Sequence, residues 1–262
     1  MTRKIGRHER TRATLAPPVL RTAFPQVKRG PRPGRLGKGD AGTARIGSVT
    51  GGAVAFVVPA IQELKKTASN TDIHVDVAPS DALIEGLLNG DYDFVLSRIP
   101  AGTDARQFNI RRGRVEVLRF VVRKGHPLTG RGRIGMHDLA GFEWVIQAPP
   151  TPMRQAIEDA FVSSGVPLPG EIVNTTSLLV MISYLDATDA IAPLTQEVAE
   201  LFDPDSHGSR FTALDVENPV IITPYHLIHR RDQVLSPLAE RLRDLVADAI
   251  SITGSAPAPE KD

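Results

Sequence analysis

Cysteine is absent from this chain of 262 residues. Without thiols the protein cannot form disulfides, a thiolate zinc site, an iron-sulfur cluster or a cysteine nucleophile, and it cannot carry a lipid anchor on cysteine. Such a composition suits a reducing compartment, so we expect a cytoplasmic location.

Long hydrophobic runs are also missing. The longest, residues 53–60, includes Pro59 and is far short of the roughly 20 residues that a membrane span needs. Near the start of the chain, arginine and proline interrupt the sequence before the apolar stretch of about 7 to 15 residues that a signal peptide requires. We therefore expect neither export nor a membrane partner.

Motifs for catalysis, metals and cofactors are lacking as well. The sequence has no serine-centred nucleophile elbow and no carboxylate pair whose spacing suggests acid-base chemistry. His226 and His229 fall on opposite faces of a predicted strand, which does not suit a metal site. Residues 37–42 (GKGDAG) fit the letters of a dinucleotide fingerprint, but no strand precedes them and a strand follows. We expect no enzyme activity, no cofactor and no metal.

The charges that are present are unevenly placed. Residues 1–45 hold twelve Lys and Arg against two acidic residues, whereas the rest of the chain holds 19 basic and 28 acidic residues. Prolines and glycines interrupt every helical or strand period in residues 1–43, which we predict to be a basic, disordered segment. It could bind phosphates without sequence preference, but Phe24 is its only aromatic residue and gives no stacking platform. We favour a tail without a function.

Residues 44–96 predict two successive βαβ units. Ser80 is a candidate N-cap and Asn89-Gly90 ends the helix that follows it. Pro59 either kinks the first helix or is accommodated near its first turns. The apolar residues of the second strand alternate and should lie on one of its faces. The predicted strands are 45–49, 72–77 and 94–96, and the predicted helices are 51–67 and 80–89.

Two longer strands, at 115–122 and 220–228, flank a second α/β block. The first is too rich in β-branched residues to be favoured as a helix, and the second is predicted from its apolar residues. An amphipathic helix over 235–250 closes the body. The block between the long strands is predicted to contain strands 144–146, 172–173 and 190–192 and helices 152–163 and 178–185. This order is typical of a hinged, two-lobed binding protein.

Three stretches resemble the effector-binding domain of LysR-type transcriptional regulators. They are residues 44–48 (ARIGS), 87–96 (LLNGDYDFVL) and 121–128 (VVRKGHPL). The second is similar to the family's L-x-x-G-x-L-D-x-x-(I/L) signature and the third to its G-H-P-L turn, and the resemblance extends over residues 40–252.

This resemblance implies an α/β, two-lobed periplasmic-binding-protein-like (type 2) fold with two hinge-crossing strands. Lobe I would comprise residues 44–118 and 222–252, lobe II residues 119–221, and residues 253–262 a disordered tail. Family members also carry an N-terminal winged helix-turn-helix of about 60 residues and a linker helix, and residues 1–37 resemble neither. We expect this chain to sense a ligand without reading DNA sequence, and we hypothesise that an upstream frameshift or a wrong start removed the DNA-binding half.

In folds of this kind, helix N-termini and capping hydroxyls between the lobes hold the acidic groups of a ligand. Candidate hydroxyls stand where predicted strands run into helices: Ser48, Thr50, Ser80, Thr151, Thr176 and Ser177. The family's effector contacts match best to Ser48, Thr50 and Ser80. Each of these hydroxyls could equally be a plain helix cap.

Two arginines complete the candidate site. Arg98 follows the third strand, and Arg154 lies in the first turn of a helix, where its charge opposes the helix dipole. Either could pair with a ligand carboxylate, or could be a solvated or ion-paired surface residue.

The sequence therefore predicts the ligand-sensing domain of a LysR-type regulator that binds a small, anionic, organic-acid-like effector. The expected partners are a second copy or a full-length paralogue. A free-standing solute receptor and a dehydratase-like enzyme on the same fold are the alternatives. Turnover of a bound acid would establish the enzyme, and the lack of a signal peptide argues against the receptor.

Overall fold

The computed structural model describes residues 40–202 and 210–252. The expectations for residues 1–39 and for the tail 253–262 lie outside these ranges. No helix within the described residues is both long and apolar enough to cross a membrane.

The first part of the fold, called lobe I here, is built on a five-stranded sheet in the order β2-β1-β3-β11-β4. β1, β2 and β3 run parallel, and β11 runs antiparallel to both β3 and β4. The bounds are β1 Gly42–Ser48, β2 Thr71–Val77, β3 Phe94–Ser97, β4 Phe108–Arg112 and β11 His226–Arg230. Three of these strands were predicted in place, whereas β4 was not predicted.

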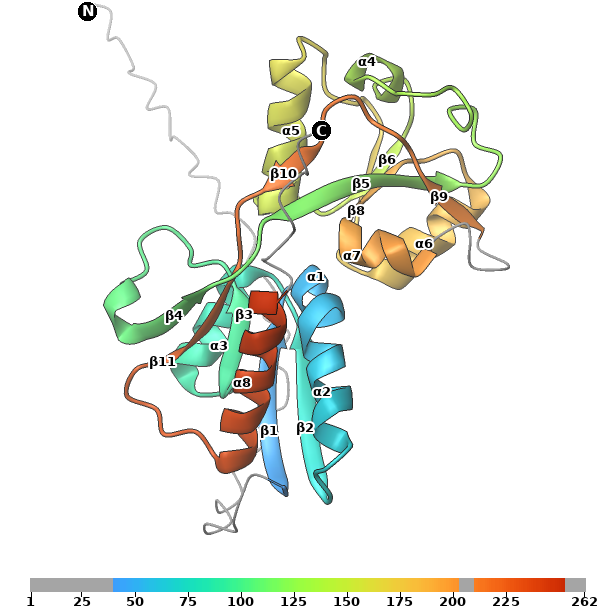
Figure 1. Cartoon of the computed structure of the whole chain (residues 1–262). Coiled ribbons are helices and arrows are strands. Elements are labelled where there is room, and N and C mark those ends of the chain that lie inside the picture. Colours follow the sequence, from blue (N-terminus) through green and yellow to red (C-terminus); the bar gives the residue numbers. More distant parts are fainter. Residues whose placement is uncertain (1–39, 203–209, 253–262) are drawn as a thin grey trace, which may run out of the picture. The chain divides into compact units, whose positions relative to one another are not determined.

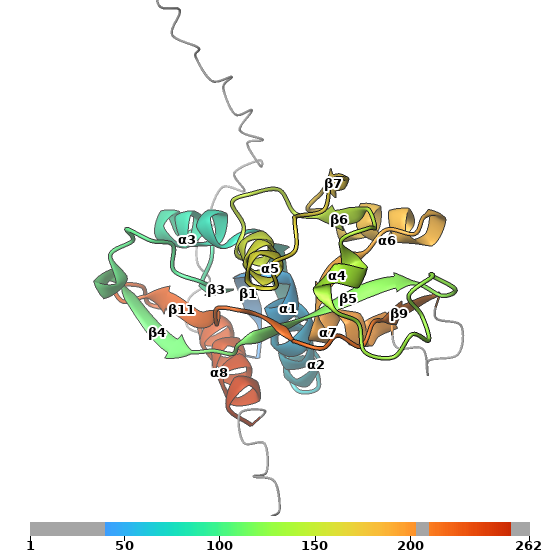
Figure 2. The ribbon, with the colours of Figure 1, turned by 90° about the horizontal axis from the view of Figure 1, so that it is seen from above.

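Helices cover both faces of this sheet. Figure 2 shows α3 on one face and α2 with α8 on the other, with the strands between them. The elements are α1 Thr50–Gly52, η2 Ala53–Val57, α2 Val58–Lys65, α3 Ser80–Asn89, η3 Ala105–Gln107 and α8 Pro237–Ile252. The helix predicted at 80–89 ends as expected, because Gly90 adopts the left-handed conformation with φ of 79°.

Pro59 coincides with an irregularity in the first helix of lobe I. The helical stretch from Thr50 to Lys65 is interrupted by the π-helical segment η2, which ends two residues before Pro59. Proline has no backbone N–H to donate to the preceding turn, and the wider π turn lies where that hydrogen bond is missing. Pro59 is thus accommodated at the start of α2, one of the two outcomes expected.

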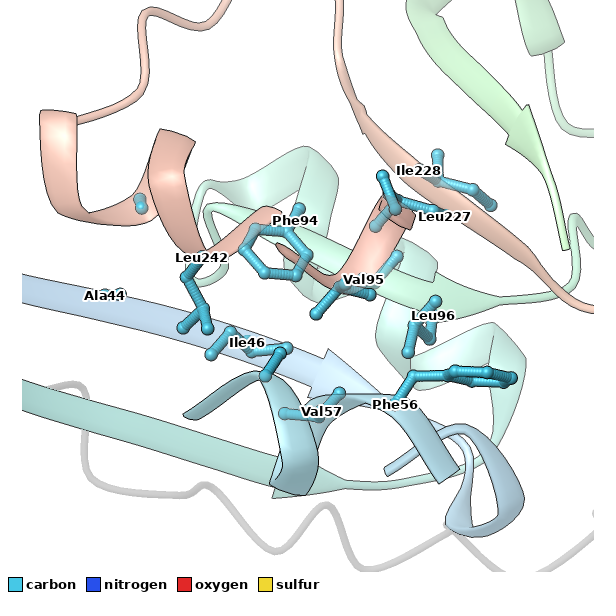
Figure 3. Close-up of a cluster of buried hydrophobic side chains, with 14 of the residues drawn as sticks. Ala44, Ile46, Phe56, Val57, Phe94, Val95, Leu96, Leu227, Ile228 and Leu242 are labelled. Carbon is cyan, nitrogen blue, oxygen red and sulfur yellow. The ribbon is translucent and has the colours of Figure 1, made fainter. Parts of the chain in front are cut away.

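The core of lobe I lies between the sheet and its helices. Figure 3 shows Ile46 of β1, Phe56 and Val57 of η2, Val95 of β3 and Leu242 of α8 gathered in this layer. The apolar face of β2 does not join it fully, because β2 is an edge strand and Val75 and Val77 are 36% and 54% exposed. The prediction that one face of this strand is apolar was right, but that face is only partly buried.

The second part, lobe II, has a sheet in the order β10-β5-β8, with β9 also paired to β5, and a separate parallel pair, β6-β7. Its elements are β5 Glu116–Arg123, α4 Met136–Leu139, β6 Trp144–Ile146, α5 Pro152–Ser163, β7 Ile172–Asn174, α6 Leu178–Ala187, β8 Ala192–Thr195, α7 Gln196–Ala199, η4 Glu200–Phe202, β9 Phe211–Ala213 and β10 Val220–Ile222. The predicted block of strands and helices is present, with β8 shifted by two residues. Residues 116–118 and 222, which were predicted to belong to lobe I, are part of β5 and β10 of this sheet.

The single tryptophan marks the core of lobe II. Trp144 is 1% exposed, and its ring lies edge-on to Phe120 and Phe161 at centroid distances of 5.3 and 5.4 Å. Its indole N–H donates to the Leu139 carbonyl at 3.2 Å, so its one polar group is satisfied.

The chain crosses between the two sheets twice, after β4 and after β10 (Figure 1). The predicted strand 220–228 is broken, because Pro224 lies between β10 and β11 and cannot donate to a ladder. At the crossing, Gly113 N–H donates to Nδ1 of His226 at 3.2 Å, and Tyr225 N–H donates to the Arg114 carbonyl at 3.2 Å. A Cβ on Gly113 would overlap the Tyr225 carbonyl, so only glycine fits where the two segments pass.

Candidate functional site

The carboxyl ends of three parallel strands bring the lobe I candidates together. In the sheet register Ser48, the last residue of β1, is paired with Val77 of β2 and with Leu96 of β3. Ser48 is fully buried, and its hydroxyl donates to the Val49 carbonyl at 2.8 Å. Its backbone carbonyl accepts from Ala78 N–H at 3.3 Å. Ser48 therefore ties the end of β1 to the start of the next connection.

Ser80 does not cap its helix as predicted. Pro79 occupies the N-cap position of α3, and Ser80 is the first helical residue with no capping hydrogen bond. Its hydroxyl instead accepts from Arg98 N–H at 3.3 Å, and its carbonyl accepts from the Ser97 hydroxyl at 3.3 Å. The prediction failed because proline at 79 already has the extended backbone that an N-cap needs, which moves the helix start by one residue. Ser80 and Arg98 are nevertheless direct neighbours.

In lobe II the candidates follow the parallel strands β6 and β7. Thr151 is the N-cap of α5, and its hydroxyl accepts from Arg154 N–H at 3.3 Å. Ser177 is the N-cap of α6, and its hydroxyl accepts from Val180 N–H at 3.4 Å. Thr175 N–H donates to the Ile146 carbonyl at 3.0 Å, which joins the ends of the two strands. Both capping hydroxyls thus already have a structural partner.

Thr50 and Thr176 differ from the other candidates. Thr50 is half-buried at the start of α1, and Thr176 is exposed beside the start of α6. Their hydroxyls have no hydrogen-bond partner among residues 40–202 and 210–252. They are therefore the predicted hydroxyls that a ligand could engage without breaking an existing bond.

Arg98 is held at the crossing between the lobes. Its guanidinium forms an ion pair with Glu116, the first residue of β5, and its Nε donates to the Thr223 carbonyl at 2.7 Å. The two side chains are only 12% and 3% exposed. Arg98 also lies over the ring of Tyr225, with 6.0 Å from Cζ to the ring centroid. Its charge is therefore already balanced by a carboxylate from the other lobe.

Arg154 is balanced within its own helix. Its Nε donates to Glu158 at 2.5 Å, one turn further along α5. It also lines a cavity of about 10 Å³ whose walls include Trp144, Leu168 and Ile172. Glu158 supplies the counter-charge that its position against the helix dipole calls for.

Further polar residues that the sequence did not single out surround Arg98 and Glu116. A Cβ on Gly51 of α1 would overlap the Glu116 carboxylate and would lie 3.0 Å from Oγ1 of Thr195. Lobe I and lobe II therefore meet here. We call the six polar side chains at this point the junction cluster, and they are Arg98, Arg114, Glu116, Thr195, Glu197 and Tyr225.

The electrostatics of the junction cluster follow from its burial. Burial raises the pKa of Glu116. The positive charge of Arg98 lowers this pKa, and the negative charge of Glu197 raises it. Burial also raises the pKa of Tyr225 far above its ordinary value, and the carboxylates of Glu116 and Glu197 raise it further. Tyr225 is therefore a neutral phenol, able both to donate and to accept a hydrogen bond.

One sequence signal could have pointed to this cluster. Glu116 lies at the edge of a run of β-branched and aromatic residues predicted to be a buried strand, and a carboxylate is rarely buried without a partner. The identity of that partner depends on the crossing between the lobes and cannot be inferred from local residue spacing.

Within residues 40–202 and 210–252, no group of three or more His, Cys, Asp or Glu side chains could hold a metal ion.

Comparisons with known sequences agree with the sequence motifs. A model of the LysR substrate binding domain matches residues 37–251. The chain is 37% identical over 166 residues to the HTH-type transcriptional regulator GbpR of Rhizobium radiobacter, covering 63% of this chain and 55% of that protein. It is 32% identical over 200 residues to GbpR of Azospirillum brasilense, covering 76% of this chain and 58% of that protein. The chain thus spans a little more than half the length of these relatives.

Solved structures share the fold at low sequence identity. The CcmR regulatory domain of Synechocystis PCC6803 in complex with 2-PG has a TM-score of 0.65 at 18% identity, covering 82% of this chain and 99% of that one. The effector binding domain of QuiR in complex with shikimate has a TM-score of 0.63 at 15% identity, covering 81% and 98%. The two-lobed, type 2 periplasmic-binding-protein-like fold is therefore confirmed, and the chain belongs to the LysR substrate binding domain family.

Proposed function

We propose that this domain senses a small organic acid and thereby controls transcription. The observation that carries the proposal is a pair of hydroxyls, on Thr50 and Thr176, that have no hydrogen-bond partner in the part of the chain that the structure describes. One follows β1 of lobe I and the other follows β7 of lobe II. A ligand that engages both would bridge the lobes.

The acidic group of the effector would be held by backbone N–H groups at helix starts. The first N–H groups of α3 and α6 have no partner within their own helices, and they carry the positive end of each helix dipole. Ser80 and Ser177 lie at these two starts. A carboxylate or phosphate is the kind of group that such N–H donors stabilise.

Bound effector would act by shifting the populations of lobe arrangements. A ligand changes such an equilibrium only through different affinities for its states. The matched relatives are named HTH-type transcriptional regulators. We extend this to the present domain as a cytoplasmic sensor, not an enzyme, that works with a second copy or a full-length paralogue and relies on a separate domain to read DNA.

The test is a thermal-shift screen of the chain against organic acids, including shikimate and 2-PG, the ligands named for the two solved structures. An acid at about a hundredfold excess over its Kd should raise Tm by roughly 5 °C. Thr50→Val and Thr176→Val should each weaken binding of a hit about tenfold, because each loses one hydrogen bond to a charged or polar group.

Thr212→Val in β9 is the matched control. Thr212 is half-buried, and its hydroxyl has no partner among the described residues, so its substitution should leave binding unchanged. Equal affinity of all three variants and the parent chain would count against the proposed site. Chemical analysis of the recovered acid separates sensing from dehydratase-like turnover, since a sensor returns the acid unaltered.

A further inference from the structure

We infer that the junction cluster binds an uncharged, hydroxyl-bearing part of the effector. The inference rests on the proposed function and names a chemical class for the ligand. It is carried by buried polar atoms that come from both lobes and both crossings. The cluster adjoins the start of α3, because Arg98 N–H donates to the Ser80 hydroxyl.

The cluster converges on one place. A Cβ added to Gly51 would lie close to both the Glu116 carboxylate and the Thr195 hydroxyl. Arg98 connects Glu116 to the ring of Tyr225, and Tyr225 N–H bonds to the Arg114 carbonyl. The pKa of Tyr225 is shifted by Glu116, Glu197, Arg114 and Arg98, which places their charges near its hydroxyl.

Four buried atoms of the cluster have no hydrogen-bond partner within residues 40–202 and 210–252. They are one terminal guanidinium nitrogen of Arg114, Oγ1 of Thr195, Oε2 of Glu197 and the hydroxyl of Tyr225. Tyr225 is fully buried and Thr195 is 5% exposed. Burial of a polar group without a partner is unfavourable, and native proteins rarely retain several such groups together. Each of the four atoms therefore retains the capacity to form a hydrogen bond with a bound group.

The charges of the cluster cancel. Arg98 and Arg114 contribute two positive charges, and Glu116 and Glu197 two negative ones. Glu116 is already paired with Arg98. A further anion or cation would find no net opposite charge there, and its desolvation would go uncompensated. The ligand group at the cluster is therefore neutral.

The unpartnered atoms also define its hydrogen-bonding character. The Glu197 oxygen only accepts, the Arg114 nitrogen only donates, and the hydroxyls of Thr195 and Tyr225 do both. A ligand hydroxyl also donates and accepts, so two or more neighbouring hydroxyls satisfy this set. An aromatic or aliphatic acid without hydroxyls would leave it unsatisfied.

The experiment uses four six-carbon probes with the full chain. Gluconate and hexanoate share a carboxylate and a chain length but differ in their hydroxyls, and glucitol and hexanol are their uncharged counterparts. Binding is measured by calorimetry. Gluconate should bind at least tenfold tighter than hexanoate, since each hydrogen bond made at the cluster contributes about that factor.

Two near-isosteric variants test the contact directly. Thr195→Val and Tyr225→Phe each remove an unpartnered hydroxyl, so each should weaken gluconate binding about tenfold. Neither should lower the Tm of the free protein, because no internal hydrogen bond is lost. Tyr184→Phe is the matched control, since its hydroxyl bonds to Glu143 instead. It should leave gluconate affinity unchanged.

The outcomes separate this inference from the proposed function. If hexanoate binds as tightly as gluconate, the inference is overturned while sensing of an organic acid stands. Binding of glucitol without any binding of the two acids supports the inference and removes the acidic group from the proposed function. Failure of both hydroxylated probes to bind, or unchanged gluconate affinity in both variants, overturns the inference.

Discussion

Arg98 and Glu116 form a buried ion pair that connects the end of β3 in lobe I to the start of β5 in lobe II. The Arg98 Nε also donates to the carbonyl of Thr223, which lies in the second crossing. One guanidinium thus contacts both the first strand of lobe II and the second crossing. Because both charges are removed from water, each depends on the other for its stability.

Removing one member of this pair should be costly. Glu116→Ala leaves the Arg98 charge buried without its partner, and we expect a loss of about 3 kcal/mol in the free energy of unfolding. The measurement is urea denaturation followed by circular dichroism. Arg106→Ala is the control, because the Arg106–Asp104 pair is exposed and its loss should cost less than about 1 kcal/mol.

The double variant Arg98→Met/Glu116→Leu provides an independent check. Replacing both charges with apolar side chains removes the desolvation cost together with the attraction. We expect the double variant to be more stable than Glu116→Ala. A double variant less stable than the single one would contradict this account of the pair.

Gly51→Ala should disturb the contact between the lobes. Its Cβ would overlap the Glu116 carboxylate and press on Thr195, so we expect a loss of about 1 to 3 kcal/mol from overpacking. Thermal unfolding of the parent chain and the variant measures this loss of stability. Gly141→Ala, whose Cβ would meet nothing within 4 Å, should be neutral or slightly stabilising. Similar effects of the two substitutions would argue against close contact at Gly51.

Asp93 fixes β3 against β1. Its carboxylate accepts from Arg45 N–H at 2.9 Å, and its own N–H donates to the Arg45 carbonyl at 2.7 Å. Asp93→Ala should therefore cost about 2 kcal/mol, the usual contribution of a hydrogen bond to a charged group. Asp91→Ala, an exposed neighbour, should stay within about 0.5 kcal/mol of the parent chain. Equal stability of the two variants in urea would refute this role.

His126 should make stability depend on pH. It is buried, its Nε2 donates to the Asp189 carbonyl at 3.0 Å, and its Nδ1 accepts from Leu128 N–H at 3.1 Å. Burial lowers its pKa below the ordinary value of 6.5, so the unfolded chain takes up the proton first as pH falls. The stabilisation is complete above about pH 6.5 and decreases below it.

The measurement compares unfolding free energies at pH 7.5 and 5.5. Burial also lowers the pKa of His226 and His229, so the parent chain loses stability through all three histidines. His126→Gln should lose less over the same interval, because one proton no longer takes part. Parallel losses in the two proteins would exclude His126 as a contributor.

Much of the fold could be predicted because local signals and tertiary structure agree. Gly90 ends α3, and Thr151 followed by Pro152 begins α5, as each motif predicts. β4 was missed because only its first residue, Phe108, is buried, so no apolar alternation marks it. Its pairing with β11 depends on a segment more than a hundred residues away, which local patterns do not record.

The candidate site was predictable only in part. Hydroxyls at strand ends follow from the order of elements, and Arg98 and Ser80 do lie side by side. The junction cluster depends instead on the two crossings passing each other at Gly113 and Tyr225. Neither Thr195 nor Tyr225 belongs to a motif, and a lone hydroxyl in an apolar strand is usually a packing residue.

The position of β11 in the sheet has a consequence for how the chain folds during synthesis. β11 lies between β3 and β4, yet it leaves the ribosome after every strand of lobe II. The strands of lobe II are contiguous in sequence, and lobe II can therefore assemble first. β3 and β4 cannot pair with β11 until that strand has been synthesised. A chain that stops before residue 226 would therefore retain the strands of lobe II but lose α8 and the strand that joins β4 to the rest of the lobe I sheet.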